Sequence, residues 1–161
     1  MERLELQLER LKRWIREMSE AQWLTREAFR SWEIVRTTYV LPGQYENTAP
    51  YPEGQGLDHF PSVQGTTYYF RATPDLSGYA EDGRVGLLFE SGGEGLLRAN
   101  GKSYQGLDRN HAYVTLDLER IGTHPELEIE LFDPVPEPVD PLNRQAVIQP
   151  PIASIRSELV R

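Results

Sequence analysis

The spacing of apolar residues near the amino terminus predicts a helix. Five of them recur at intervals of four, three, four and three, with charged and amide side chains between: Leu4, Leu8, Leu11, Ile15 and Met18. This spacing places them along one face of an α-helix. We expect this amphipathic helix, within residues 1–24, to pack on the domain that follows. The same stripe can also seed a coiled coil between chains, although it lasts little more than two heptads.

After residue 30 the pattern changes to short runs of β-branched and aromatic residues. Such runs occur at 31–41, Thr66–Ala72, Gly83–Glu90, His111–Asp117 and Glu126–Phe132. The last two alternate polar with apolar residues, as antiparallel strands with one buried face do. Asn100-Gly101 stands between two further β-prone runs and predicts a tight hairpin, because both turn positions need a positive φ.

Two segments rich in turn residues interrupt these strands. Residues 42–66 predict a long irregular loop. Six prolines between 133 and 151 exclude a helix there and fit an extended strap. Short strands without alternating helices predict a mainly β fold, an antiparallel β-sandwich. We therefore expect a helix at 1–24, a sandwich at 25–133 and a Pro-rich strap or linker at 134–161.

Composition limits the partners of this 161-residue chain. Its formal net charge of −8 argues against nucleic acid or an anionic membrane as the main partner, because both need clustered Lys and Arg. With no cysteine, the chain has neither a disulfide nor a thiolate metal site. The charged amphipathic start lacks the apolar core of a signal peptide, and no run approaches the ~20 apolar residues of a membrane span. We expect a cytoplasmic protein.

The sequence contains no complete catalytic set. His59, His111 and His124 lie too far apart for the three- or four-residue spacing of a helical metal site. Ser91-Gly92-Gly93 lacks the strand–turn–helix setting of a nucleophile elbow, and a turn explains its glycines. Several carboxylates could pair across a glycosidic bond: Glu90, Glu94, Asp108 and Asp117. Most of the acidic residues, however, alternate with apolar ones on strands, which is the pattern of a solvated face. We assign no catalytic residue and no metal ligand.

The sharpest polar cluster is Asp108-Arg109-Asn110-His111. Asp and Asn commonly bond their own backbone in turns, so an Asx-turn explains them without a ligand. Alternatively, they contact sugar hydroxyls or a neighbouring domain, and His111 bonds Glu94 across the hairpin. The candidate contact residues are Glu94, Gln105, Asp108, Asn110 and His111. The chain's tyrosines could add stacking faces for sugars, although aromatic side chains are also ordinary core.

Two blocks of sequence resemble a known family. Gly92-Gly-Glu-Gly-Leu-Leu, Asn100-Gly101 and Gln105-Gly-Leu-Asp-Arg-Asn-His111 are similar to the amino-terminal domain of cytoplasmic-type α-mannosidases of glycoside hydrolase family 38. The run Pro141-Leu-Asn-Arg-Gln-Ala-Val-Ile-Gln-Pro-Pro-Ile-Ala-Ser154 is similar to the stretch that leads out of that domain. The helix and the segment through Phe70 fit the same layout, so the resemblance covers nearly the whole chain.

The resemblance implies a jelly-roll-like sandwich, akin to galactose-binding domains, ahead of a catalytic domain. Family members remove terminal α-linked mannose with retention, using a carboxylate nucleophile and a divalent metal, usually zinc. Their His-x-Asp metal motif lies in the catalytic domain, and no His-x-Asp occurs in this sequence. The resemblance therefore implies a non-catalytic domain, without a cofactor of its own, that packs on a catalytic domain in cis and lines its substrate site. An autonomous carbohydrate-binding module and a structural domain that forms homo-oligomers remain alternatives.

Overall fold

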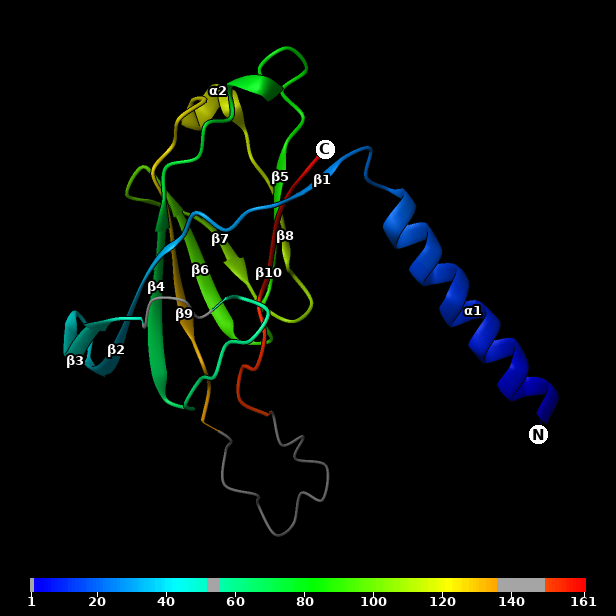
Figure 1. Ribbon diagram of the computed structural model, residues 1–161, viewed down its shortest axis with the longest axis horizontal. Coiled ribbons are helices and arrows are strands. Elements are labelled where there is room, and N and C mark those ends of the chain that lie inside the picture. Colours follow the sequence, from blue (N-terminus) through cyan, green and yellow to red (C-terminus); the bar gives the residue numbers. More distant parts are fainter. Residues whose placement is uncertain (1, 52–55, 136–149) are drawn as a thin grey trace, which may run out of the picture.

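The computed structural model describes residues 2–51, 56–135 and 150–161, with side chains from Leu4 onward (Figure 1). Its helices are α1 (Glu2–Ala21) and α2 (Leu118–Ile121), with a 3-10 turn at Ser77–Tyr79. Its strands are β1 (Arg26–Ala28), β2 (Glu33–Leu41), β3 (Gln44–Pro50), β4 (Thr66–Ala72), β5 (Gly86–Glu90), β6 (Glu94–Ala99), β7 (Lys102–Leu107), β8 (Tyr113–Thr115), β9 (Leu127–Phe132) and β10 (Arg156–Val160).

The described strands form two antiparallel sheets with a shared core. One sheet has the order β1-β10-β5-β8 and the other the order β3-β2-β4-β9-β6-β7. Figure 1 shows the two sheets as separate layers, with α1 projecting away from them. The mainly β sandwich with an amino-terminal helix is thus confirmed.

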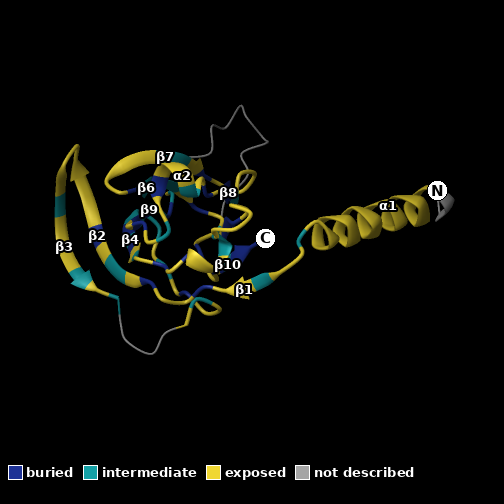
Figure 2. Ribbon diagram, turned by 90° about the horizontal axis from the view of Figure 1, so that it is seen from above, coloured by how far each residue is buried: buried dark blue, intermediate teal, exposed yellow. Residues whose placement is uncertain are grey.

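Alternation along the strands fills the space between the sheets. On β9, Leu127, Ile129 and Leu131 are buried while Glu128 and Glu130 point to the other face. Trp32 joins the layers: its ring meets Phe70 edge-on at 6.1 Å and Phe89 at 6.0 Å. Each such buried apolar side chain stabilises the fold by about 1.5–3 kcal/mol. Figure 2 shows the buried positions gathered between the sheets.

The segment predicted as one irregular loop contains a strand. Residues Gln44–Pro50 form β3, which pairs with β2 through a turn that has Gly43 at φ 77°. The seven residues of β3 are exposed or half-buried, so they carry no apolar alternation by which to recognise a strand. In Figure 2 the β2–β3 hairpin stands out as a wing beside β4. The Asn100-Gly101 hairpin is confirmed, with φ of 51° and 76°.

The carboxyl-terminal residues differ from the predicted strap. β10 lies inside the four-stranded sheet, between β1 and β5, and Ile155, Leu159 and Val160 are buried. The prolines ahead of it obscured this strand. Residues 150–161 therefore belong to the sandwich. The remainder of the predicted strap from residue 136, with most of the second resembling block, lies outside the described residues.

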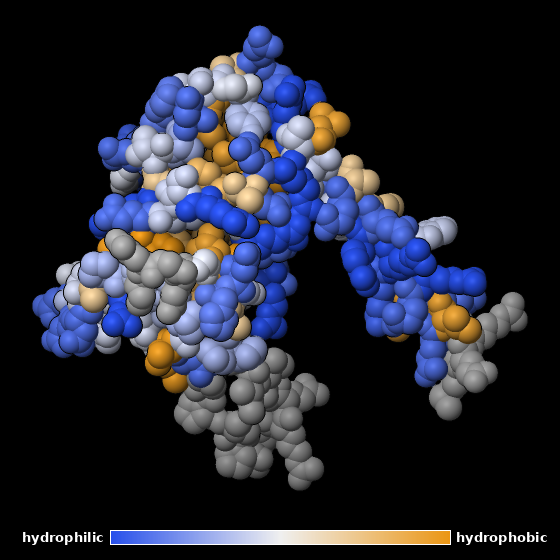
Figure 3. Space-filling view, in the orientation of Figure 1, coloured by the Kyte–Doolittle hydropathy of each residue, from blue (hydrophilic) through white to orange (hydrophobic). Residues whose placement is uncertain are grey.

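Helix α1 forms as predicted but does not bury its stripe. Leu8, Leu11 and Ile15 remain 52%, 55% and 53% exposed. Figure 3 shows apolar side chains at the surface of α1 among polar ones. The carboxyl end of α1 is tied to the sandwich by an ion pair between Glu20 and Arg26. Nowhere in the described chain is a helix both long and apolar enough for a membrane span.

Candidate functional site

The loop between β7 and β8 is braced by one carboxylate. Asp108 Oδ1 accepts from the backbone N–H of Asn110 at 2.7 Å and of His111 at 2.9 Å. The ring Nδ1 of His111 lies 3.0 Å from both carboxylate oxygens. Backbone bonds between residues 108 and 111 close the loop in both directions. The Asx-turn interpretation of Asp108 therefore describes this geometry, and His111 pairs with Asp108 rather than with Glu94.

The ionised Asp108 carboxylate is stabilised by the hydrogen bonds that it accepts. The hydrogen bonds from His111 and from the Asn110 amide lower the pKa of the Asp108 carboxyl. The side chains of His111 and Asp108 are still 70% and 47% exposed. The loop is thus a braced, solvent-facing surface on which Arg109 and Asn110 are also exposed.

Two other predicted contact residues have separate roles. Gln105 donates from Nε2 to the carbonyl of Tyr113 at 2.9 Å and so links β7 to β8 of the opposite sheet. Glu94 begins β6, where it pairs with Phe132 on β9 and is exposed. The pairing of Gly95 with Leu107 puts Glu94 and Asp108 at the same open end of the β6–β7 hairpin. Gln105 thus has a hydrogen bond within the sandwich, while the others share one end of it.

The described residues hold no group of three or more His, Cys, Asp and Glu placed to bind a metal ion. His124 lies beside Asp75, with Nε2 and Oδ1 3.2 Å apart. The Ser91-Gly92-Gly93 segment is a turn, in which the Gly93 N–H donates to Ser91 Oγ. A Cβ on Gly93 would come within 2.7 Å of the Phe132 carbonyl oxygen, so close backbone packing explains this glycine.

A second candidate site lies on the outer face of the six-stranded sheet. Side chains of β4, β9, β6 and β3 form a continuous ladder of ion pairs and hydrogen bonds. Arg71 donates from Nε to Glu128 at 2.8 Å, and Arg98 reaches Glu128 at 3.2 Å and Glu130 at 2.8 Å. The hydroxyl of Tyr45 donates to the other oxygen of Glu130 at 2.9 Å.

The Tyr45–Glu130 bond shows that this sheet is strongly curved. In the strand order, β3 is three positions from β9, which is about 14 Å in a flat sheet at 4.7–4.9 Å per strand. A direct bond over that separation requires the β2–β3 wing to curl toward the ladder. The wing therefore forms one wall of a groove, which we call the outer groove.

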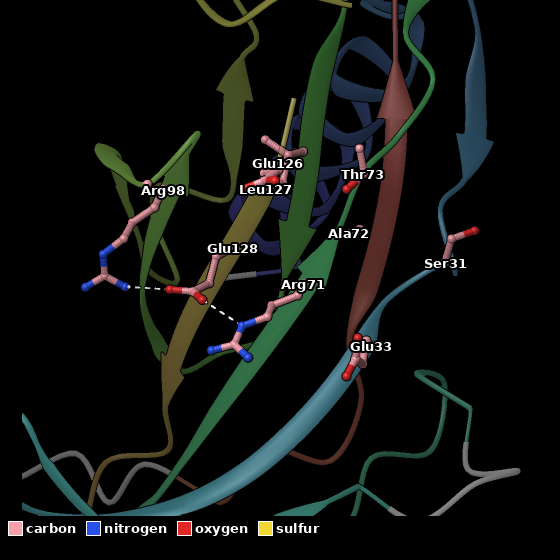
Figure 4. Close-up of a pocket in the computed structure, with 10 residues that line it drawn as sticks. Ser31, Glu33, Arg71, Ala72, Thr73, Arg98, Glu126, Leu127 and Glu128 are labelled. Carbon is pink, nitrogen blue, oxygen red and sulfur yellow. Dashed lines mark hydrogen bonds and ion pairs between the residues drawn. The ribbon is translucent and has the colours of Figure 1, made fainter. Parts of the chain in front are cut away.

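The outer groove consists of two adjoining hollows of about 480 and 440 Å³. Arg71, Arg98 and Glu128 line both of them. Figure 4 shows the Glu128 carboxylate between the two guanidiniums in the first hollow. Tyr45 and Tyr69 line the second, their ring centroids 5.7 Å apart. Volumes of this size are typical of small-molecule sites, which span about 300–1,000 Å³.

The surroundings of the outer groove raise the pKa of two of its groups, Tyr69 and Arg98. Burial raises the pKa of the Tyr69 hydroxyl, with Tyr45 and the Glu130 carboxylate raising it further. The hydrogen bond to Glu130 raises the pKa of Arg98. The Arg71 guanidinium carbon lies 5.5 Å from the Tyr69 ring centroid, within cation–π range. At neutral pH Tyr69 is thus a neutral phenol beside the paired charges.

Sequence reasoning missed this groove although its residues were visible. The alternating Glu128 and Glu130 were interpreted as a solvated face, and Arg71 and Arg98 were not singled out. The available signal was an outward-facing Arg on each of two strands, matched by outward-facing Glu on a third. Only the register, Arg71 opposite Glu128 and Glu128 opposite Arg98, brings them together.

Comparisons with known proteins identify no family. No protein-family model and no curated protein matches the chain. Among solved structures, a Bacteroides fragilis protein assigned as a beta-galactosidase is 16% identical, with a TM-score of 0.44, over 84% of this chain and 23% of that one. The beta-D-glucuronidase of Dictyoglomus thermophilum is 10% identical, with a TM-score of 0.42, over 84% of this chain and 28% of that one. This chain thus spans about a quarter of the length of either protein, and similarity of this degree carries over neither residues nor an activity.

Proposed function

We propose that this chain is the non-catalytic amino-terminal domain of a glycosidase of the family 38 α-mannosidase type. The observation that carries the proposal is the Gln105–His111 block. Its sequence resembles that family, and its residues 108–111 form an exposed loop braced by its own carboxylate. A loop held in this way can meet a partner without first having to be ordered, which lowers the cost of binding.

The proposed partner is an α-mannosidase catalytic domain in cis, at the edge of whose substrate site the loop packs. Asp108 and His111 satisfy each other, so they shape the loop. Arg109 and Asn110, both exposed, are then the contact residues. The divalent metal, zinc in this proposal, and the nucleophile belong to the catalytic domain. The proposed location is the cytoplasm.

The proposal is tested on the whole gene product with p-nitrophenyl α-D-mannopyranoside as substrate. Asn110→Ala combined with Arg109→Ala should lower turnover about tenfold or more, because a small displacement at a substrate site is costly. Arg84→Ala, at an exposed position outside the loop, is the control and should leave turnover unchanged. Absence of mannosidase activity, or a double variant with unchanged turnover and unchanged melting temperature, would contradict the proposal.

The exposed stripe of α1 favours a second role, self-association. Most of the stability of a helix in a protein comes from packing of its apolar face, and the ion pairs Glu9–Lys12 and Arg13–Glu17 of α1 add only about 0.2–0.5 kcal/mol each. Burial of the stripe against a second copy would supply the missing stabilisation. Leu4, Leu11 and Met18 recur every seven residues, with Leu8 and Ile15 between them, so the stripe has a two-heptad pattern suited to pairing.

Light scattering on the intact chain decides this second role. Leu8→Glu with Ile15→Glu places charge on the stripe and should reduce a dimer mass to that of the monomer. Leu6→Glu is the matched control, because Leu6 lies on α1 outside the stripe and is 60% exposed. A monomer mass for the unmodified chain at every concentration would rule out self-association through α1.

A further inference from the structure

The outer groove has a charge pattern that selects against charged ligands. Its two guanidiniums and the carboxylates of Glu128 and Glu130 are already paired. A phosphate or sulfate group at Arg71 or Arg98 would either displace a carboxylate, losing charge-assisted bonds about twice as strong as neutral ones, or lie beside the carboxylates of Glu128 and Glu130 and be repelled by them. Glu33 and Glu126 at the rim add negative charge and disfavour anions further. A neutral ligand leaves every pair intact.

In the ladder, guanidinium donors alternate with carboxylate acceptors, each within hydrogen-bond distance of the next. Arg71 uses Nε in its pair with Glu128, so its terminal nitrogens are not part of that bond. Each carboxylate oxygen of Glu128 and Glu130 accepts one bond in the ladder and has capacity for another. A hydroxyl group both donates and accepts, so neighbouring hydroxyls can bond to such a row without leaving a group unsatisfied.

Aromatic rings complete the lining beside the ladder. Tyr69 lies in the second hollow with Tyr45, and Tyr39 contacts Tyr45 edge-on at 5.8 Å. Tyrosine combines an apolar face with a polar tip, which suits a ligand that has apolar C–H faces and a hydroxylated rim. A pyranose ring has this composition. The two hollows share three residues, so an elongated ligand can occupy both.

We infer that the outer groove is a binding site for a neutral oligosaccharide. Arg71, Arg98, Glu128 and Glu130 bond its hydroxyls, and Tyr45 and Tyr69 pack on its rings. None of these residues belongs to the Asp108–His111 loop, so the site is separate from the proposed contact with a catalytic domain. It goes beyond that proposal, and either can fail alone.

The test is a titration of the isotope-labelled chain followed by backbone amide NMR shifts. Mannotetraose and maltotetraose are the neutral probes, a heparin tetrasaccharide is the anionic probe and spermine the cationic one. We expect a neutral probe to cause saturable shifts at Tyr69, Arg98 and Glu128, with a Kd of about 1 mM or tighter, equivalent to about 4 kcal/mol. Shifts confined to other residues, binding of charged probes alone, or no shifts would overturn the inference.

Variants then locate the site. Arg98→Gln should weaken binding of the neutral probe at least tenfold, whereas Arg84→Gln, outside the groove, should leave Kd unchanged. Tyr45→Phe keeps the ring and removes the hydroxyl that holds Glu130, so it should weaken binding severalfold in a chain that stays folded. An unchanged Kd for both Arg98→Gln and Tyr45→Phe would overturn the assignment.

Discussion

At the scale of single residues, polar side chains in this protein act mainly by fixing backbone and neighbouring side chains. Asp108 accepts bonds from two amides and an imidazole. Asp133, fully buried, accepts from Ser62 Oγ at 2.5 Å and from the Ile152 N–H at 3.1 Å. It thus joins the end of β9 to the chain that enters β10. In both cases one carboxylate fixes, by hydrogen bonds, a loop or chain segment that lies outside the strands.

The loop should loosen in acid through Asp108. Because His111 and the Asn110 amide hold its pKa below the ordinary value of about 3.9, the brace is complete above about pH 4 and is lost as pH falls through the lowered pKa. NMR titration of the side-chain carboxyl should give a midpoint below 3.9, with the 110 and 111 amides shifting together. Asp108→Asn is the control. A midpoint at or above 3.9 would contradict the brace.

Gly86 should not tolerate a side chain. A Cβ there would lie 2.2 Å from Tyr113 Cε2, and Tyr113 in turn contacts Trp23 at 4.7 Å between ring centroids. Gly86→Ala should therefore lower the free energy of unfolding by about 1–3 kcal/mol and shift tryptophan fluorescence. Gly78→Ala, at an open position, is the control for urea denaturation. Equal midpoints for both variants would show that the ring moves away freely.

Residue-level chemistry was partly predictable. Asp108 and His111 were singled out because their spacing is short and local, and a local Asx-turn follows from local sequence. Arg71, Arg98 and Glu130 lie on three different strands and are at least 27 positions apart in the sequence. No local pattern therefore pairs Arg98 with Glu130. Their meeting depends on strand register and on the curl that brings Tyr45 to Glu130, neither of which single-sequence periodicity contains.

At the scale of elements, the five-residue strand β10 holds two other strands in the four-stranded sheet. It pairs with β1 on one side and β5 on the other, and its loss would leave β1 without a partner and β5 paired with β8 alone. Sequence reasoning assigned this region to a strap because prolines dominated the composition. By contrast β4 and the Asn100-Gly101 hairpin were predictable, since β-prone composition and turn chemistry are local. The polar β3 was not, because it is defined by its pairing with β2.

Truncation in β10 should therefore be costly. Leu159→Ala removes a side chain that is only 7% exposed and should lower the free energy of unfolding by about 2–5 kcal/mol. Leu24→Ala is the matched control, because Leu24 is 81% exposed and its loss should change stability by less than about 0.5 kcal/mol. Urea denaturation followed by circular dichroism measures both. A Leu159→Ala midpoint equal to that of the control would show that β10 is not part of the cooperative fold.

At the scale of the whole molecule, the sandwich is a scaffold with three unlike surfaces. The Asp108–His111 loop is hydrogen-bonded and exposed, the outer groove is polar with paired charges, and α1 presents an uncovered apolar stripe. None of them joins a nucleophile to a base or assembles a metal site within the described residues. The accessory role that we propose would use the loop as its contact with a catalytic domain.

Sequencing the gene beyond the codon for Arg161 tests this central claim most directly. The account predicts an open frame that continues into a domain containing His-x-Asp, the metal motif of the family that the Gln105–His111 block resembles. A stop codon at that position, or a following domain without this motif, would contradict the assignment to an α-mannosidase.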